Sequence, residues 1–201
     1  ILLNLTEMYA NDPDTGAIFE SLGDLGVFDD VRYAIPTQIY PVVWVVNTEI
    51  LEAAGVAVPG YDWTYQQLEA IARATTNENT HIIGMYGCSF YNRELPKILK
   101  IQNAGSDAAQ LAYANTWRSF SFDGTKFNFD DPVFLTAMTM LVDAIDGGYC
   151  VRELSAETLN EWYLDPAYTP TYNGKVAVWR EASWSLKNHF SEMLFEWDVY
   201  P

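Results

Sequence analysis

The chain has 201 residues, of which 49% are hydrophobic and 19% charged, which suits one packed domain and leaves too little length for two ordinary ones. Lys and Arg number 11 against 27 Asp and Glu, which gives a formal net charge of −16. So acidic a surface repels phosphate backbones and anionic headgroups, and we therefore expect no nucleic-acid partner and no direct binding to a membrane surface.

The sequence starts at Ile1 without an initiator Met or a signal peptide, and we expect it to be a fragment of a longer protein. The first 30 residues are acidic and rich in turn formers, which indicates short helices and loops. The runs Val31–Ile35 and Val42–Val46 are β-branched and aromatic and predict buried strands. A helix is expected to follow from Asn47 and to end at Gly55.

The middle of the chain continues this alternation. Thr64 and Gln67 have the spacing of a capping box at the start of an amphipathic helix. Residues 81–87 predict a short strand that ends at a glycine, and residues 95–102 predict another helix before Gly105.

The clearest helix is predicted from Asp131 to Ile145, with Asp131 as its N-cap and Pro132 at its first position. Its expected buried stripe is Phe134, Ala137, Met138, Leu141, Val142 and Ile145. A short helix capped by Ser155, a strand over residues 175–180, a helix over 183–195 and a strand over 197–201 complete the chain. Short strands that alternate with helices predict an α/β domain.

Two cysteines, Cys88 and Cys150, lie 62 positions apart without the spacing of a zinc cluster or a dithiol redox motif. In an exported protein they could pair and close a long loop. Two buried free thiols are the alternative that we favour slightly, because cysteine is among the most buried residue types.

Several short motifs follow one another along the chain. They are Tyr33-Ala34-Ile35-Pro36, the strand end at Asn47, the helix end at Gly55, Asp62-Trp63-Thr64 with Leu68, Phe127–Pro132 with Gly148-Tyr149, Asn173–Val178 with Ser183-Trp184, and Phe195–Pro201. In this order they resemble the extracellular sugar-binding proteins of ABC importers, the family that includes maltose-binding protein. The resemblance covers about Leu2 to Pro201, and Ala182 departs from it where a glycine is usual.

The resemblance implies an α/β fold of the periplasmic-binding-protein type, in which helices flank a short, mostly parallel sheet. Residues 1–35 would be the end of a first lobe and the approach to a hinge. Residues 36–198 would form the second lobe of a two-lobed receptor, and residues 199–201 would return toward the first lobe.

The function that the resemblance implies is capture of a sugar or short oligosaccharide for an ABC importer, with hinge closure around the ligand and docking on a membrane permease. The expected protein is a monomer, extracellular or periplasmic, and tethered to the membrane as a lipoprotein in its full-length form. No cofactor and no metal are expected.

The expected ligand-binding residues are aromatic and polar side chains near strand ends. They are Trp184, Tyr40, Glu181, Tyr91, Asn92, Gln38 and Ser89. Trp184 matches the family position that provides a stacking platform for a sugar ring, although a Trp at a helix start can also pack on its own domain. Arg180 would indicate an acidic sugar if it faced the ligand.

Two other classes of function stay open at this point. The plentiful carboxylates leave room for a glycoside-active enzyme, and the aromatic residues leave room for a carbohydrate-adhesion module. We expect no enzyme, because the two histidines, His81 and His189, stand in no motif with a nucleophile and no catalytic elbow or phosphate-binding loop occurs.

Overall fold

The computed structural model describes residues 2–18, 22–103, 106, 127, 129–162, 164, 170–189 and 191–201, without the side chain of Asn92. The chain divides into two compact units, Ile1–Tyr40 and Pro41–Pro201. This boundary lies five residues after the one predicted from the sequence between residues 35 and 36.

The first unit consists of short elements around one buried arginine. Its elements are α1 (Thr6–Asn11), η1 (Pro13–Ala17), β1 (Val27–Phe28) and β2 (Val31–Arg32). Arg32 is only 7% exposed, and its guanidinium donates to the carbonyl oxygens of Leu25 and Ala34 at 3.1 and 3.2 Å. The guanidinium carbon also lies 3.8 Å from the centre of the Tyr9 ring. These partners satisfy the buried charge, which would otherwise be costly.

The predicted buried strand over Val31–Ile35 is shorter than expected. Only Val31 and Arg32 pair, with β1 in an antiparallel hairpin, and Ile35 is 37% exposed. The hairpin turns at Asp29 and Asp30, both of which have positive φ, as a tight two-residue turn requires. The Tyr33 amide still donates to the Gly26 carbonyl oxygen at 2.8 Å, but residues 34–41 pair with no strand, so this extended segment is not part of a sheet.

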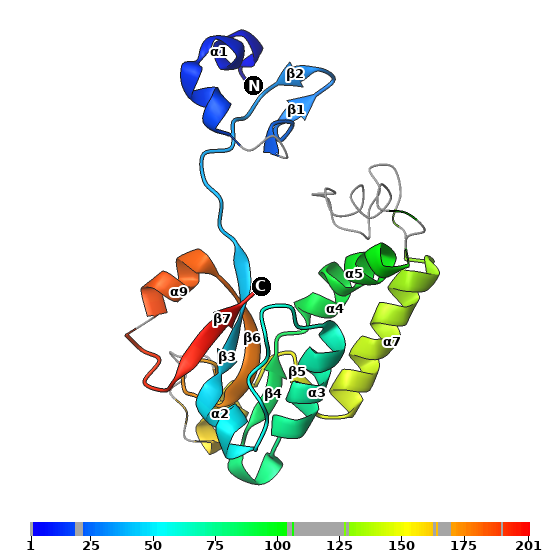
Figure 1. The fold of residues 1–201 in the computed structure, drawn as a ribbon, viewed down its shortest axis with the longest axis vertical. Coiled ribbons are helices and arrows are strands. Elements are labelled where there is room, and N and C mark those ends of the chain that lie inside the picture. Colours follow the sequence, from blue (N-terminus) through cyan, green and yellow to red (C-terminus); the bar gives the residue numbers. More distant parts are fainter. Residues whose placement is uncertain are drawn as a thin grey trace. The chain divides into compact units, whose positions relative to one another are not determined.

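The second unit contains a five-stranded sheet in the order β5-β4-β6-β3-β7 (Figure 1). Its strands are β3 (Val42–Asn47), β4 (Ile83–Tyr86), β5 (Cys150–Val151), β6 (Val176–Ala182) and β7 (Trp197–Tyr200). The pairs β5-β4 and β4-β6 are parallel, and β3 is antiparallel to both β6 and β7. The predicted α/β lobe with helices around a short sheet is confirmed, and its parallel pairing is confined to β5, β4 and β6.

Helices cover both faces of this sheet (Figure 1). They are α2 (Thr48–Ala53), α3 (Tyr65–Thr75), η3 (Glu78–Thr80), α4 (Ser89–Arg93), α5 (Leu95–Gln102), α7 (Pro132–Asp146), α8 (Ala156–Glu161) and α9 (Ser183–His189). Side chains of β3 alternate between the two cores, as the period of a strand requires. Trp44 and Val46 pack with residues of α2, α3, α4, α5 and α7, whereas Val43 and Val45 pack on the other face with Leu186 of α9.

Helix starts agree closely with the sequence. The Thr64 and Gln67 capping box has both of its hydrogen bonds, and the carboxylate of Asp131 accepts from the Val133 backbone amide at the start of α7. Two residues of the predicted α7 stripe, Val142 and Ile145, are instead 53% and 45% exposed. Helix α9 ends at His189, six residues before the predicted end.

Candidate functional site

Four strands end, and one begins, on the same side of the sheet. We call this row of strand termini, which is not an edge strand, the strand-end edge. Strands β4, β5, β6 and β7 run in one direction and β3 runs in the other. The first residues of β3 therefore lie beside the last residues of β6 and β7: Trp44 pairs with Arg180 on one side and with Tyr200 on the other. Ligands of open α/β folds bind at the carboxyl ends of such strands.

Trp184 lies at this edge because α9 begins directly after the last residue of β6. The backbone amide of Ser183 donates to the carbonyl oxygen of Pro41 at 2.9 Å, which fixes the turn between the strand and the helix. Trp184 is 54% exposed, so much of its ring is free to contact a ligand. Ala182 is part of β6 and has no positive φ, so the alanine that replaces a glycine there is unstrained.

Glu181, just before this turn, is held by a polar network. One of its carboxylate oxygens accepts from the Tyr172 hydroxyl at 2.8 Å, and the other accepts from the Ala182 amide at 3.2 Å. The Tyr172 ring stacks on His189 at 4.3 Å between ring centres. Burial, reinforced by the negative charge of Glu181, raises the pKa of Tyr172 to about 12. The hydroxyl is therefore protonated at neutral pH and keeps Glu181 in one orientation as a hydrogen-bond acceptor.

Arg180 is engaged by an acidic partner from another element. Its guanidinium nitrogen lies 2.7 Å from a carboxylate oxygen of Glu94, which lies between α4 and α5. Burial raises the pKa of Glu94, and the adjacent Arg180 charge opposes that rise. Arg180 therefore has its counter-ion within the protein and does not act as a free cation at this edge.

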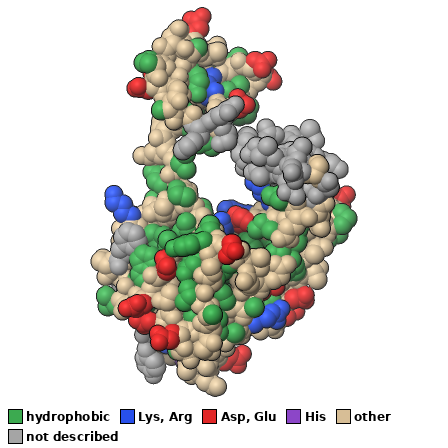
Figure 2. Space-filling view, viewed as in Figure 1, with side chains coloured by type: hydrophobic (Ala, Val, Ile, Leu, Met, Phe, Trp, Pro, Cys, Tyr) green, Lys and Arg blue, Asp and Glu red, His purple; other side chains and the backbone are tan. Residues whose placement is uncertain are grey.

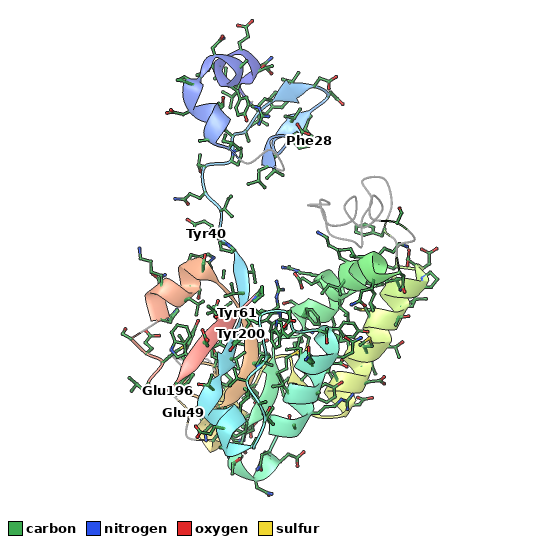
Figure 3. The ribbon with its side chains drawn as sticks, in the orientation of Figure 1. Phe28, Tyr40, Glu49, Tyr61, Glu196 and Tyr200 are labelled. Carbon is green, nitrogen blue, oxygen red and sulfur yellow. The ribbon has the colours of Figure 1, made fainter. Side chains whose placement is uncertain are left out.

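An aromatic cluster joins β3, β7, α4 and the loop before α3. Trp44 meets Phe90 and Trp63 edge-on at 5.1 and 6.0 Å between ring centres, and Tyr200 lies 5.2 Å from Tyr61 and 5.7 Å from Trp63. Tyr61 is 69% exposed, and Figure 3 shows it beside Tyr200. In Figure 2 hydrophobic side chains gather on this face of the second unit, with acidic side chains around them. Such a surface suits the apolar face of a ring-shaped ligand.

The hollows of the second unit are not all at this edge. A pocket of about 100 Å³ lies within the aromatic cluster, between Trp63, Phe90 and Pro201. Larger hollows, of about 470 and 670 Å³, share Glu49 and Phe195 and include none of the residues predicted to bind a ligand. Figure 3 shows Glu49 with Glu196, whose backbone amide donates to the Glu49 carboxylate at 3.0 Å.

The residues predicted on α4 have different environments. Ser89 is exposed at the first turn of the helix. Tyr91 is completely buried, and its hydroxyl donates to Glu69 of α3 at 3.0 Å, so it belongs to the core of the lobe. Burial is also the main reason that the pKa of Tyr91 is raised. Asn92 is on α4, but its side chain lies outside the described part of the structure.

Gln38 and Tyr40 belong to the first unit, at its end. Both are exposed, and the Tyr40 hydroxyl donates to the side-chain oxygen of Gln38. Gln38 also lines a pocket of about 280 Å³ together with Leu22 and Pro36.

Sequence reasoning did not single out Tyr172, Tyr61 or Tyr200 as parts of a site. Tyr172 precedes the Asn173-Gly174 turn, and nothing in the local pattern indicates that it meets Glu181, nine residues away. Tyr61 and Tyr200 are 139 residues apart, and they come together because the loop before α3 packs on the end of β7, where the Trp63 indole also donates to the Pro201 carbonyl oxygen.

Among the described residues, no three His, Cys, Asp or Glu side chains gather as metal ligands would. Nor does any helix in the described ranges combine the length and the apolar character needed to cross a membrane.

Comparisons with known proteins identify the fold. No protein-family model and no curated protein matches this sequence. Among solved structures, a substrate-binding protein of an ABC transporter from Listeria monocytogenes, in complex with cycloalternan, superposes with a TM-score of 0.69 and 23% identity over 99% of this chain and 47% of its own. A solute-binding protein from Thermotoga lettingae bound with α-D-tagatose gives a TM-score of 0.66 and 18% sequence identity. The match covers 100% of this chain and 49% of the Thermotoga chain.

The same fold also occurs with a ligand of another kind. UgpB from Mycobacterium tuberculosis, in complex with glycerophosphocholine, gives a TM-score of 0.67 and 15% identity over 100% of this chain and 47% of its own. The chain thus has the fold of ABC-transporter solute-binding proteins and spans about half the length of the solved structures that it matches.

Proposed function

We propose that this chain captures a sugar or short oligosaccharide for an ABC importer, and that it contributes mainly the second lobe of a two-lobed receptor. The observation that carries the proposal is Trp184, a half-exposed indole at the strand-end edge, which follows by three positions a carboxylate held in one orientation, Glu181. An aromatic face and a hydrogen-bond acceptor are what a pyranose needs, because its C–H face is apolar and its rim is made of hydroxyl groups.

The sugar-bound solved structures of this fold support the choice of ligand, since two of the proteins compared above are complexes with carbohydrates. The ion pair between Arg180 and Glu94 favours a neutral sugar over a uronate, because Arg180 is already neutralised. Within the described part of the structure the Glu181 carboxylate accepts from Tyr172 and Ala182, and a carboxylate has further lone pairs that can accept sugar hydroxyls.

The mechanism that we propose is closure of two lobes on the ligand. A ligand that touches both lobes binds the closed form more tightly than the open form, and this difference in affinity shifts the population toward the closed form. The closed receptor would then dock on a permease, outside the cell or in the periplasm, as a monomer on a lipid tether. Binding without catalysis is sufficient for this role.

The test is ligand binding by the full-length protein with both lobes. A panel of neutral mono- and oligosaccharides, a uronate and glycerophosphocholine would be screened by thermal shift and then by calorimetry. A ligand supplied at about 100 times its Kd stabilises by about 2.7 kcal/mol, which raises the melting temperature by several degrees. We expect a neutral sugar to give this shift and the uronate to give less.

Two site variants and a control make the test specific. Trp184→Ala should weaken sugar binding roughly tenfold to hundredfold, because it removes the stacking surface, and Glu181→Gln should weaken it less. Phe129→Ala removes another half-exposed aromatic ring, at the start of α7, and should leave the affinity unchanged. A response to glycerophosphocholine alone, or equal affinity in the Trp184→Ala variant, would refute the proposed ligand site.

A further inference from the structure

Two buried thiols are in direct contact in the second unit. The sulfur atoms of Cys88 and Cys150 lie 3.4 Å apart, and both cysteines are free. Cys150 is 2% exposed and Cys88 is 9% exposed. The two residues are 62 positions apart in the sequence, so their contact is a product of the fold.

Pairing of β4 with β5 brings the two residues together. Met85 is in register with Cys150, and beyond the end of β4 the Gly87 amide donates to the Val151 carbonyl oxygen at 2.8 Å. Gly87 has φ +87°, a left-handed conformation that turns the chain directly after this last bond. The turn brings Cys88, which precedes α4, over the edge strand that carries Cys150.

The simplest role for such residues is core filling, since a buried cysteine behaves as a small hydrophobic side chain. The surroundings of the two thiols nevertheless shift their pKa values in opposite directions. A hydrogen bond from the Cys150 thiol is the main cause that lowers the pKa of Cys88, with Arg152 acting in the same direction and burial against it. The Cys88 sulfur and burial together raise the pKa of Cys150. A less deeply buried cysteine whose thiol ionises more readily, in contact with a thiol that stays protonated, is the arrangement of an attacking and a resolving cysteine.

We propose that Cys88 and Cys150 are a reversible disulfide pair, formed by exchange with a small-molecule disulfide such as oxidised glutathione. The Cys88 thiolate attacks one sulfur of that disulfide and releases the first glutathione thiolate, which takes up a proton. The Cys150 thiol then loses its proton, and its sulfur attacks the Cys88 sulfur and breaks the mixed disulfide. The second glutathione leaves as a thiol, and two electrons have passed from the two protein thiols to the oxidant.

The bond would join the start of α4 to the edge strand β5. Helix α4 carries Phe90, which packs on Trp44 in the aromatic cluster, so oxidation would stiffen one side of the strand-end edge. Closing a loop of 62 positions restricts the unfolded chain, and this effect stabilises the oxidised protein whatever ligand the receptor binds. The inference is therefore independent of the proposed function.

The experiment compares the folded, full chain in reduced and in oxidised glutathione. The protein is then unfolded in denaturant, the thiols that remain are blocked with N-ethylmaleimide, and the intact mass counts the blocked thiols and any attached glutathione. We expect the oxidised protein to have lost both thiols, to carry no glutathione, and to melt on the order of 10 °C higher, a rise that dithiothreitol reverses.

Single variants separate the two roles. Cys150→Ser should retain one glutathione on Cys88 and show no rise in melting temperature, whereas Cys88→Ser should react far more slowly. Circular dichroism verifies that the variants fold, and the thiol count of the wild type decides the matter even if they do not. Two thiols that stay free in the folded wild type under oxidising conditions, or a product that carries two glutathiones, would overturn the proposal.

Discussion

Helix α3 lies very close to strand β4 at Gly84, and this contact leads to a quantitative prediction. A Cβ atom on Gly84 would lie 1.9 Å from the carbonyl oxygen of Ala72 in α3 and 2.6 Å from the hydroxyl oxygen of Thr76. That hydroxyl accepts from the Gly84 amide at 3.2 Å and donates to the Ala72 carbonyl at 2.8 Å. An alanine at this position can be accommodated only if the end of α3 moves away from β4.

The expected cost has two parts. Overpacking of a well-filled core costs about 1–3 kcal/mol, and loss of the hydrogen bonds through Thr76 adds about 1 kcal/mol. Gly84→Ala should therefore destabilise by about 3 kcal/mol and lower the melting temperature by about 6–12 °C. Gly55→Ala is the matched control, because its Cβ would meet open space and only its φ of +68° costs about 1 kcal/mol.

The measurement is thermal and urea unfolding of the full chain with each substitution. A Gly84→Ala variant that melts within the range of the Gly55→Ala variant would mean that α3 does not lie this close to β4. The reasoning from the Cβ position would then be wrong. An increase in the urea slope would instead indicate a change in the denatured state and would require the comparison at the midpoint.

Two further predictions concern single hydrogen-bonded side chains. Asp131→Ala should cost about 1–2 kcal/mol, because it removes the N-cap of α7 and the Lys100 partner at 2.9 Å, whereas the exposed neighbour Asp130→Ala should be nearly neutral. Burial would raise the pKa of Asp131, but the bond from Lys100 and the N-cap bond outweigh it and lower that pKa. The contribution of the ionised Asp131 to the free energy of unfolding is therefore complete above the ordinary carboxyl pKa, and it disappears as the pH falls through the lowered pKa of the folded state. The unfolding curves of wild type and Asp131→Ala should converge only below about pH 4. Trp63→Phe removes the 3.0 Å bond from the indole nitrogen to the carbonyl of Pro201 and should cost about 1 kcal/mol, seen as faster amide exchange at the end of β7; unchanged exchange would contradict this.

Local signals in the sequence predicted local structure well. The Thr64 and Gln67 box, the Asp131 cap and the Ser155 cap all form as predicted, because each depends on residues within three positions of one another. A side chain's burial depends on distant parts of the chain. Tyr91 follows a strand end, as a ligand-binding residue would, yet its side chain is buried in the core and its hydroxyl donates to Glu69 of α3.

Contacts between distant segments explain what the sequence could not predict about the candidate site. From the sequence, Arg180 could be a salt-bridged residue or, if it faced the ligand, a sign of an acidic sugar, and only the fold shows that Glu94, 86 positions earlier, is its partner. The two cysteines posed the same difficulty, since their spacing allowed pairing as readily as separation. The place of Trp184 at the start of a helix could be predicted, because it depends on a local event, a helix that begins where a strand ends; its role in binding stays a prediction.

The direction of β3 determines which side chains the strand-end edge collects. If β3 ran parallel to β6, its last residue, Asn47, would lie at this edge, and its first residues would lie at the opposite one. Because it runs antiparallel, Trp44 lies between Arg180 and Tyr200, and the segment around Pro41 contacts the start of α9. One reversed strand thus brings the aromatic cluster, on one face of the sheet, to the same strand-end edge as Trp184 and the oriented Glu181 carboxylate, which lie at the turn from β6 into α9.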